Sequence, residues 1–391
     1  MNNDQGFTTS KSVVVTGIGL ISALGQLKSS WQKLIQGQSG IRLCQLFPEL
    51  PPQPLALINA QPADLDWMTG TLVTEALADA SLTSPLPDCG VVMGSSRGYQ
   101  GQWEQQAQEF QPEKGLFPQF LHHQVALQAA RQMGATGPVL TPMAACATGL
   151  WAIASAYELI QTGHCQQVIA GAVEAPITPL TLAGFNRMGA LAKTGAYPFD
   201  AHREGFVLGE GGAVFVLESA EFAQRRAVPI YGRILGWGLT ADACSLNRPN
   251  LVGKSAIRAI QQALQRSGLS PHEIDYIHAH GTATDLNDRH EANLIQSLFS
   301  APVPVSSTKG ATGHTLGASG ALGLAFCLMA LKHQLLPPCV GLTAAEFPLN
   351  FVREARLTEL QHLLCFSFGF GGQNAVISLE GDMMGLGVNS D

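Results

Sequence analysis

The sequence predicts an α/β fold made of two similar halves, on three observations. The chain has 391 residues, more than one hydrophobic core usually organises. Short apolar runs rich in β-branched residues alternate with stretches of helical periodicity, which is typical of α/β sheets. Residues 138–160 and 304–331 also share an outline, in which a short strand is followed by a turn with a reactive side chain and then by a helix of small residues.

The elements can be predicted in chain order. Residues 13–16 are β-branched and precede two glycines, so we expect a buried strand that ends in a turn. We then expect a helix at 31–35, irregular proline-rich chain at 47–62, an amphipathic helix at 72–82, and strands at 91–93, 138–141, 213–217, 304–307 and 375–379. We interpret the polar segment EFAQRR after Ser219 as a linker, which divides the chain into domains 1–220 and 221–391.

Composition narrows the function classes. Hydrophobic residues make up 46% and charged residues 13% of the chain, so we expect a second copy to cover part of the surface, as in a homodimer. The net charge of −7, without clustered lysines and arginines, gives no basis for nucleic-acid binding. Residues 316–331 are apolar but interrupted by glycines and shorter than the roughly 20 residues of a membrane span, so they predict a buried helix. The polar, acid-containing amino end is unlike a secretory signal, and we expect a cytoplasmic protein.

The eight cysteines form no CxxC pair, which fits a reducing compartment and argues against structural zinc, so we expect no metal and no cofactor. Cys146 differs from the others because small residues flank it and a helix follows at once. A helix start offers free N–H groups and a positive dipole end, which lower the pKa of a thiol. Cys146 is therefore the nucleophile candidate, although a cysteine in such a sequence is more often an inert core thiol.

Two histidines could work with this nucleophile. His280 lies where a predicted strand meets a glycine and two threonines, and His314 lies in a turn before a helix. Either one alone could equally be a satisfied core histidine, which is how we interpret His278. Lys309 stands in an apolar stretch, and it is either a surface lysine or a buried one with an electrostatic role beside a histidine.

The segment SFGFGGQN from residue 367 alternates glycines with Phe368 and Phe370. Such a turn can aim backbone N–H groups into a cavity while the two rings wall it, as an oxyanion hole beside an apolar channel requires. The segment lacks the lysine and the helix of a phosphate-binding loop, so nucleotide binding is not expected.

Taken together, these motifs resemble the elongating β-ketoacyl carrier-protein synthases, condensing enzymes of the thiolase-like fold. The resemblance covers nearly the whole chain, through VVVTGIG from residue 13, ACATG from 145, REGFVLGEG from 203, HGTAT from 280, residues 309–320, and SFGFGGQN from 367. It implies a five-layered αβαβα architecture of two duplicated halves. The first half would carry Cys146, and the second would carry His280, Lys309 and His314.

The resemblance also implies a reaction. Cys146 would take an acyl group from an acyl carrier protein as a thioester, and malonyl carrier protein would then lose carbon dioxide under the influence of His280 and His314. The resulting carbanion would attack the thioester and give a 3-oxoacyl carrier protein, in fatty-acid or in specialised lipid or polyketide synthesis. Lys309 would polarise the histidine pair, and the N–H groups of Cys146 and Phe370 would hold the oxyanion. The substrate contacts would be Phe185 at the acyl tunnel, Thr282 and Thr284 along the pantetheine arm, and Phe368 and Phe370 at the walls.

The chain departs from these relatives at two places. Between Ile41 and Leu72 it is shorter and lacks the basic helix that many relatives present to the acidic carrier protein. From residue 40 to residue 90 the only basic residue is Arg42, against six acidic ones. Relatives also place a glutamate nine residues after the second histidine, where this chain has Gly323, so we expect an altered buried polar network. Both departures favour a specialised pathway over primary fatty-acid elongation.

Two alternatives remain open at this stage. The first is a catalytically silent partner that resembles a chain-length factor, but such proteins lose the nucleophile that this chain keeps. The second is a thiolase acting on coenzyme A thioesters, which uses a second cysteine near the carboxyl end. Cys365 precedes the glycine-rich turn, and we assign it to the core.

Overall fold

The computed structural model describes residues 11–109, 117–245 and 253–382. Ten of its strands, all in the large central sheet, fall into two sets of five with the same topology. The first set consists of β1 (Val13–Ser22), β5 (Gly90–Gly94), β6 (Val139–Leu140), β7 (Gln167–Glu174) and β9 (Gly211–Ser219). The second consists of β10 (Gly232–Ala241), β11 (Tyr276–His278), β12 (Pro304–Ser306), β16 (His362–Gly369) and β17 (Gln373–Glu380). Numbered along the chain, each set has the spatial order 3-2-4-5-1, with its first three positions parallel and its last two joined by antiparallel pairing. The predicted duplication is therefore confirmed.

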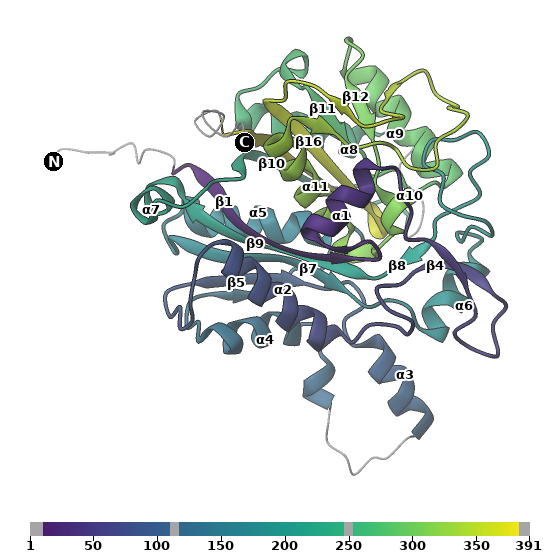
Figure 1. The fold of residues 1–391 in the computed structure, drawn as a ribbon, viewed down its shortest axis with the longest axis horizontal. Coiled ribbons are helices and arrows are strands. Elements are labelled where there is room, and N and C mark those ends of the chain that lie inside the picture. Colours follow the sequence, from purple (N-terminus) through teal and green to yellow (C-terminus); the bar gives the residue numbers. More distant parts are fainter. Residues whose placement is uncertain (1–10, 110–116, 246–252, 383–391) are drawn as a thin grey trace.

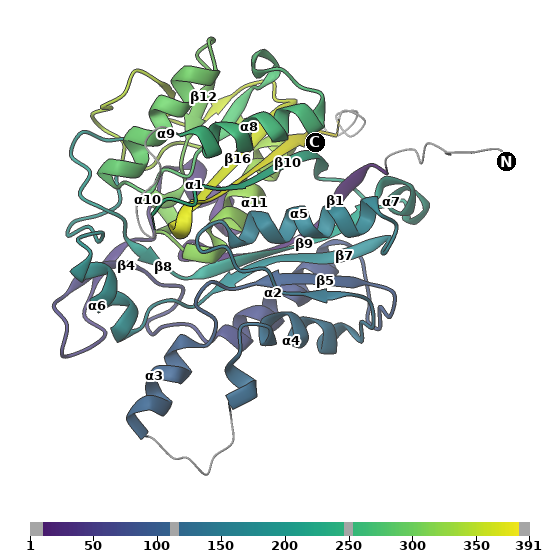
Figure 2. The ribbon, with the colours of Figure 1, turned by 180° about the vertical axis from the view of Figure 1, so that it is seen from behind.

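The helices complete five layers, which Figures 1 and 2 show from opposite sides. The outer helices of the first half are α2 (Leu65–Asp79) and α4 (Gln124–Met133), and those of the second half are α8 (Lys254–Ser267) and α9 (Asp285–Leu298). Between the two sheet halves lie α5 (Thr148–Gln161) and α11 (Ser319–His333). The halves also meet edge to edge, because β1 pairs antiparallel with β10. This is the predicted αβαβα arrangement.

Small residues allow the two central helices to pack closely. A Cβ added at Gly149 of α5 would lie 2.6 Å from the backbone nitrogen of Ala321 in α11, so only glycine permits this approach. Helix α11 is buried along almost its whole length. Among the described residues, the stretch Leu316–His333 is long and apolar enough to cross a membrane, but 89% of it is buried inside the protein, as the glycine interruptions predicted.

The remaining described elements connect these layers. They are β2 (Gly25–Gln26), α1 (Leu27–Ile35), β3 (Arg42–Cys44), β4 (Gln53–Ala56), α3 (Gln100–Glu109), α6 (Pro179–Arg187), β8 (Leu208–Gly209), α7 (Ala220–Arg226), α10 (Lys309–Thr312), β13 (Leu335–Leu336), β14 (Asn350–Phe351), β15 (Arg356–Leu357) and 3₁₀ turns at Phe117–Phe120, Pro271–Glu273, Leu316–Ala318 and Phe370–Gly372.

Three sequence expectations need correction. EFAQRR is helix α7 rather than a linker, because the Ser219 side chain accepts the Phe222 N–H and caps it. The stretch 47–62 is not wholly irregular, since β4 lies within it and pairs with β8. Helix α2 begins seven residues before the predicted start, where the Asp64 carboxylate accepts the Trp67 N–H at 2.8 Å. The predicted division at residue 220 coincides with the start of α7.

Candidate active site

Cys146 lies at a sharp bend between β6 and α5. The preceding residue, Ala145, has a φ of 47°, a left-handed conformation that turns the chain abruptly. Thr148 holds this bend, because its hydroxyl accepts the Ala144 N–H at 2.9 Å and donates to the Ala145 carbonyl at 2.7 Å. The Cys146 side chain therefore stands at the amino end of α5, just outside the first helical turn.

The end of β16 comes against this bend. A Cβ added at Gly369 would lie 2.8 Å from the Ala144 carbonyl oxygen and 3.0 Å from the Cys146 nitrogen, so the two backbones touch. The Ser367 hydroxyl donates to the Cys146 carbonyl at 2.9 Å and fixes this contact. Phe370, the residue after Gly369, donates its backbone N–H to the Cys146 thiol. The glycine-rich turn thus places a backbone N–H beside the sulfur, in the region where the carbonyl oxygen of a thioester on Cys146 would lie.

The Cys146 thiol is more weakly acidic than the sequence predicted. Burial raises its pKa to about 11, while the charge of Lys309, the Phe370 N–H and the charge of Arg97 lower it. The expected lowering by the helix start is therefore outweighed in the empty site, because the thiol is almost wholly removed from water. An unreacted Cys146 holds its proton until a substrate or a base takes it.

His280 follows β11, and a buried carboxylate fixes its backbone. The two oxygens of Glu291, in α9, accept the N–H groups of His280 at 2.6 Å and Gly281 at 2.7 Å. Gly281 has a φ of 39°, and a Cβ there would lie 2.5 Å from that of Ser307. The chain therefore turns at this point and leaves the His280 imidazole directed into the site.

His314 faces His280 from the other side of the same space. The two ring centroids are 5.4 Å apart and the planes cross at 83°. The His314 backbone N–H donates to the Val207 carbonyl at 2.7 Å, which ties the turn after α10 to the first half. Its side-chain Nδ1 has no hydrogen-bond partner among the described residues.

Both imidazoles are neutral at pH 7. Burial, and then the positive charge of Lys309, lower the pKa of His280 and of His314 well below the usual 6.5. A neutral imidazole has one N–H, so each ring can donate one hydrogen bond to an oxygen in the site.

Lys309 is buried rather than on the surface. Its ammonium donates to the His280 carbonyl and lies 3.4 Å from His280 Nδ1. Burial lowers the pKa of Lys309 from its ordinary value, while the nearby Glu291 carboxylate opposes this fall. The lysine is thus an internal cation next to the first histidine, with Glu291 as the nearest source of negative charge.

These groups meet at a cavity of about 390 Å³ formed by both halves of the chain. Its lining includes Cys146, His280 and His314, and also the predicted substrate contacts Thr282, Thr284, Phe368 and Phe370. The Thr282 and Thr284 hydroxyls are 2.9 Å apart and hydrogen-bond to each other. The structure therefore brings these seven predicted residues together, with Lys309 directly behind His280.

Phe185 does not line this cavity. Its ring packs against Phe206 at 5.1 Å and Phe370 at 6.2 Å, and the Arg97 guanidinium lies 5.1 Å over it. Phe185 shares an apolar cluster with Cys146. It therefore stands behind the part of the cavity wall that Phe206 and Phe370 form.

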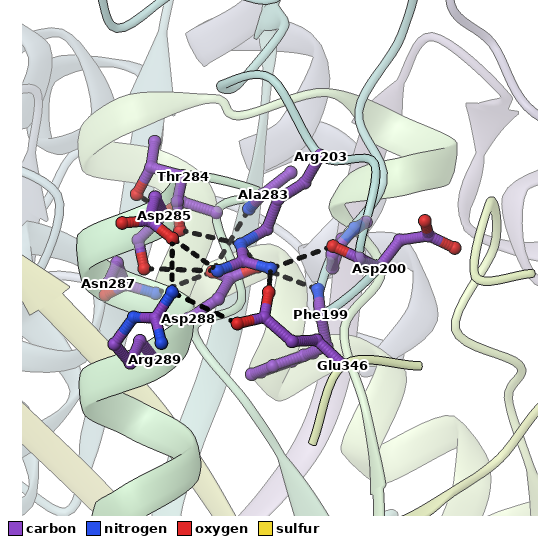
Figure 3. A network of polar contacts seen from close by, with 12 residues as sticks. Phe199, Asp200, Arg203, Ala283, Thr284, Asp285, Asn287, Asp288, Arg289 and Glu346 are labelled. Carbon is purple, nitrogen blue, oxygen red and sulfur yellow. Dashed lines mark hydrogen bonds and ion pairs between the residues drawn. The ribbon is translucent and has the colours of Figure 1, made fainter. Parts of the chain in front are cut away.

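A polar network supports the loop that contains Thr282 and Thr284 (Figure 3). Arg203, almost fully buried, contacts Asp285 at 2.9 Å and Asp288 at 3.9 Å and pairs with Glu346. Asp288 accepts the Phe199 N–H at 2.7 Å and the Ala283 N–H at 3.2 Å. Arg203 and Ala283 lie within the motifs REGFVLGEG and HGTAT, but the pattern alone assigns them no role. Here they hold the Thr282–Thr284 loop at the cavity edge.

Comparison with known proteins places this site in a family. Residues 67–223 match the N-terminal domain of β-ketoacyl synthases, and residues 231–343 match the C-terminal domain. The chain belongs to the β-ketoacyl synthase family. The mitochondrial 3-oxoacyl-[acyl-carrier-protein] synthase of Arabidopsis thaliana is 33% identical over 96% of this chain and 94% of the relative. 3-Oxoacyl-[acyl-carrier-protein] synthase 2 of Staphylococcus aureus is also 33% identical, over 94% of this chain and 97% of the relative.

Solved ketosynthases share the fold. A β-ketoacyl synthase from Burkholderia phymatum superposes with a TM-score of 0.87 at 29% identity, covering 95% of this chain and all of the other. A chain from the complex of a type II polyketide ketosynthase with its acyl carrier protein superposes with a TM-score of 0.90 at 25% identity, covering 96% and 100%. The predicted thiolase-like fold and the predicted condensing activity, which makes this synthase an acyltransferase, are thereby confirmed.

Proposed function

We propose that this ketosynthase extends an acyl chain held on Cys146 by two carbons from a malonyl carrier protein. The observation that carries the proposal is the meeting of a buried thiol, two neutral imidazoles and a backbone N–H donor at one cavity. A thioester nucleophile needs the thiol, and an enolate formed by loss of carbon dioxide needs donors near its oxygen rather than a strong base.

In the first half-reaction, the Cys146 sulfur attacks the carbonyl carbon of the acyl thioester. The bond to the pantetheine sulfur breaks, and that sulfur leaves with the proton that Cys146 gives up. Because burial raises the pKa of Cys146, the thiol keeps its proton until the substrate binds, and the leaving pantetheine sulfur takes that proton within the cavity. The Phe370 N–H stabilises the negative charge on the carbonyl oxygen.

In the second half-reaction, the malonyl carbon–carbon bond breaks and its electron pair becomes an enolate as carbon dioxide leaves. The N–H groups of His280 and His314 stabilise the enolate oxygen. The enolate carbon then attacks the thioester carbonyl, and the Cys146 sulfur leaves and recovers a proton. Lys309 keeps the His280 imidazole neutral and oriented through the contacts described above.

The proposal includes an acyl carrier protein as partner and a homodimer as the working form. Among the solved relatives, one is a ketosynthase bound to its acyl carrier protein. For the dimer, β6 lies at the edge of the sheet next to the Cys146 bend, and it exposes Leu140, which is 41% accessible, with Met143 close by at 61%. A second copy on this edge would cover both side chains. The cytoplasmic location stays a prediction from the sequence.

Mass spectrometry of the intact protein tests the proposal. We expect acyl carrier proteins of graded chain length to leave an acyl adduct on the wild-type protein, and malonyl carrier protein to discharge that adduct as a product two carbons longer. Cys146→Ala is the control, and it should fold normally but form no adduct, since alanine leaves only a small cavity among small neighbours. A wild-type protein that forms no adduct would instead be a silent partner like a chain-length factor.

A further inference from the structure

Gly323 lies in α11 at the place where the family resemblance drawn from the sequence implies a glutamate, and its neighbours show why no side chain is present. A Cβ added at Gly323 would lie 2.7 Å from Cε1 and 2.8 Å from Nδ1 of His278, and 3.3 Å from the Cys365 sulfur. Contacts under 3.0 Å are not tolerated in a packed core. The His278 imidazole and the Cys365 thiol therefore fill the space that a longer side chain at residue 323 would need.

His278 is a polar group in this core, and it is tied to the active-site lysine. It is 2% exposed, and its Nε2 lies 3.1 Å from the Thr308 hydroxyl. Thr308 immediately precedes Lys309 and is the N-cap residue of α10, the short helix that begins with this lysine. A hydrogen bond to Thr308 thus fixes the start of α10 and, with it, the backbone of Lys309.

Cys365 completes the group on the other side of the imidazole. Its sulfur lies 4.0 Å from His278 Nδ1. Although burial opposes it, hydrogen bonds from Cys327 and His278 and the charge of Lys309 lower the pKa of the Cys365 thiol. The Glu291 carboxylate opposes the fall in the pKa of Lys309 most, and the Cys365 sulfur adds to this effect when it is deprotonated.

We propose that His278, with Cys365, replaces the missing glutamate and acts as a positioning residue for Lys309 and, through Lys309, for His280. Three contacts converge on this assignment: the glycine makes room for the ring, the ring hydrogen-bonds to the residue before Lys309, and the Cys365 sulfur lies 4.0 Å from the other ring nitrogen. Among the described residues, the hydrogen-bond partners of His278 are Thr308 and Cys365, and neither lines the cavity. Because His278 acts on the site through Lys309 and His280, its effect falls on the malonyl step. The inference rests on the proposed condensation.

The test compares the two half-reactions in His278→Leu, which fills the space with no polar atom. We expect the rate of two-carbon extension of pre-acylated enzyme to fall about tenfold, while acylation of Cys146 stays within about twofold of wild type. His278→Gln, which can keep the hydrogen bond to Thr308, should recover most of the extension rate. Thr308→Val should reproduce the loss, and the double variant with His278→Leu should lose no more than either single variant.

A reciprocal exchange tests the replacement itself. Gly323→Glu alone should lower stability and extension, because its side chain collides with His278. Combined with His278→Ala, the glutamate gains space near Lys309, and extension should rise several-fold above that of His278→Ala alone.

Three results would overturn the inference: normal extension by His278→Leu, equal loss of both half-reactions, or no recovery in the exchange. Wild-type enzyme in the same assay separates this failure from that of the proposed function. A wild type that is acylated but never extends contradicts the proposed function, whereas extension by both wild type and His278→Leu contradicts this inference alone.

Discussion

The chemistry of single residues in this site follows from burial more than from formal charge. Burial keeps the Cys146 thiol protonated and both histidines neutral, although Lys309 lies beside them. Sequence reasoning selected Cys146, the two histidines and Lys309 because each stands in a recognisable turn, and the structure brings them together. It could not foresee that burial would outweigh the helix start at Cys146, because burial depends on chain segments from both halves of the fold. It also could not give His278 a role, since its partners come from three distant segments.

A first prediction at this scale concerns His314→Ala. Its ring is one of two N–H donors facing the site, but the groups that lower the pKa of the Cys146 thiol are Lys309, the Phe370 N–H and Arg97 rather than His314. We expect acylation of Cys146 to persist and extension to fall by about 100-fold or more. Single-turnover mass spectrometry of each half-reaction measures both. Equal loss in the two steps would show that His314 activates the nucleophile instead.

A second prediction concerns pH. A group whose pKa is lowered on folding stays deprotonated below its usual value of 6.5, so His280 and His314 remain neutral as the pH falls through that value. Protonation of the two histidines should therefore not limit extension by pre-acylated enzyme between pH 8 and about 6, the range in which Lys309 and Glu291 titrate with pKa values of about 8 and about 7. A midpoint near 6.5 in the single-turnover rate would contradict the lowered pKa values.

At the scale of elements, the site depends on close backbone contacts that a sequence pattern suggests only in part. The pattern SFGFGGQN correctly pointed to a turn that aims an N–H group into a cavity, and the topology explains why it can. Strand β16 is the fourth strand of its half, as β7 is in the first half, and its end meets the Cys146 bend. The helical nature of α7 and the early start of α2 were missed because caps at Ser219 and Asp64 decide them locally.

Gly369→Ala tests this contact. The added methyl group would lie 2.8 Å from the Ala144 oxygen, so β16 and the Cys146 bend must separate and the Phe370 N–H must shift from the sulfur. We expect acylation to slow by about 100-fold with the fold retained. Gly371→Ala in the same turn is the matched control, because its φ of 77° makes alanine strained but no atom lies within 4 Å. That variant should lose stability and keep acylation. Similar acylation rates in the two variants would show that the contact at Gly369 does not set the oxyanion donor.

At the scale of the whole molecule, the duplication brings Cys146 of the first half and the two histidines of the second half to a shared cavity. The two similar turns in the sequence predicted this arrangement in outline. The surface around that cavity was not predictable, because it combines side chains far apart in the chain. Acidic groups lie at the cavity, among them Glu204, Asp242 and Asp285. An acidic carrier protein therefore needs positive charge nearby to dock.

Four exposed basic residues adjoin the cavity lining in sequence or in α8. Arg187 precedes Met188, which lines the cavity, and the Lys193 backbone N–H donates to Glu204, another lining residue, at 2.9 Å. Lys254 follows Gly253, which packs against the cavity-lining residue His290. Arg258 lies one turn further along α8. No basic helix lies between Ile41 and Leu72, and among the described residues these four are exposed positive groups that, unlike Arg203 and Arg289, show no ion pair with a neighbouring carboxylate. They are the candidates for steering the carrier protein.

The last prediction reverses two of these charges, as Arg187→Glu with Lys254→Glu. Attraction between an acidic carrier and the cavity rim should turn into repulsion, so KM for the carrier-bound substrate should rise about fivefold or more at low salt and return toward wild type as salt screens the charges. Acylation by a small soluble thioester, which needs no docking surface, should not change. Lys28→Glu with Arg356→Glu changes the net charge equally on α1 and β15, away from the cavity-lining segments, and should leave both substrates unaffected. If the carrier-bound and the small substrate respond alike to the first variant, these residues do not form the docking surface, and a partner protein or another face must supply the positive charge.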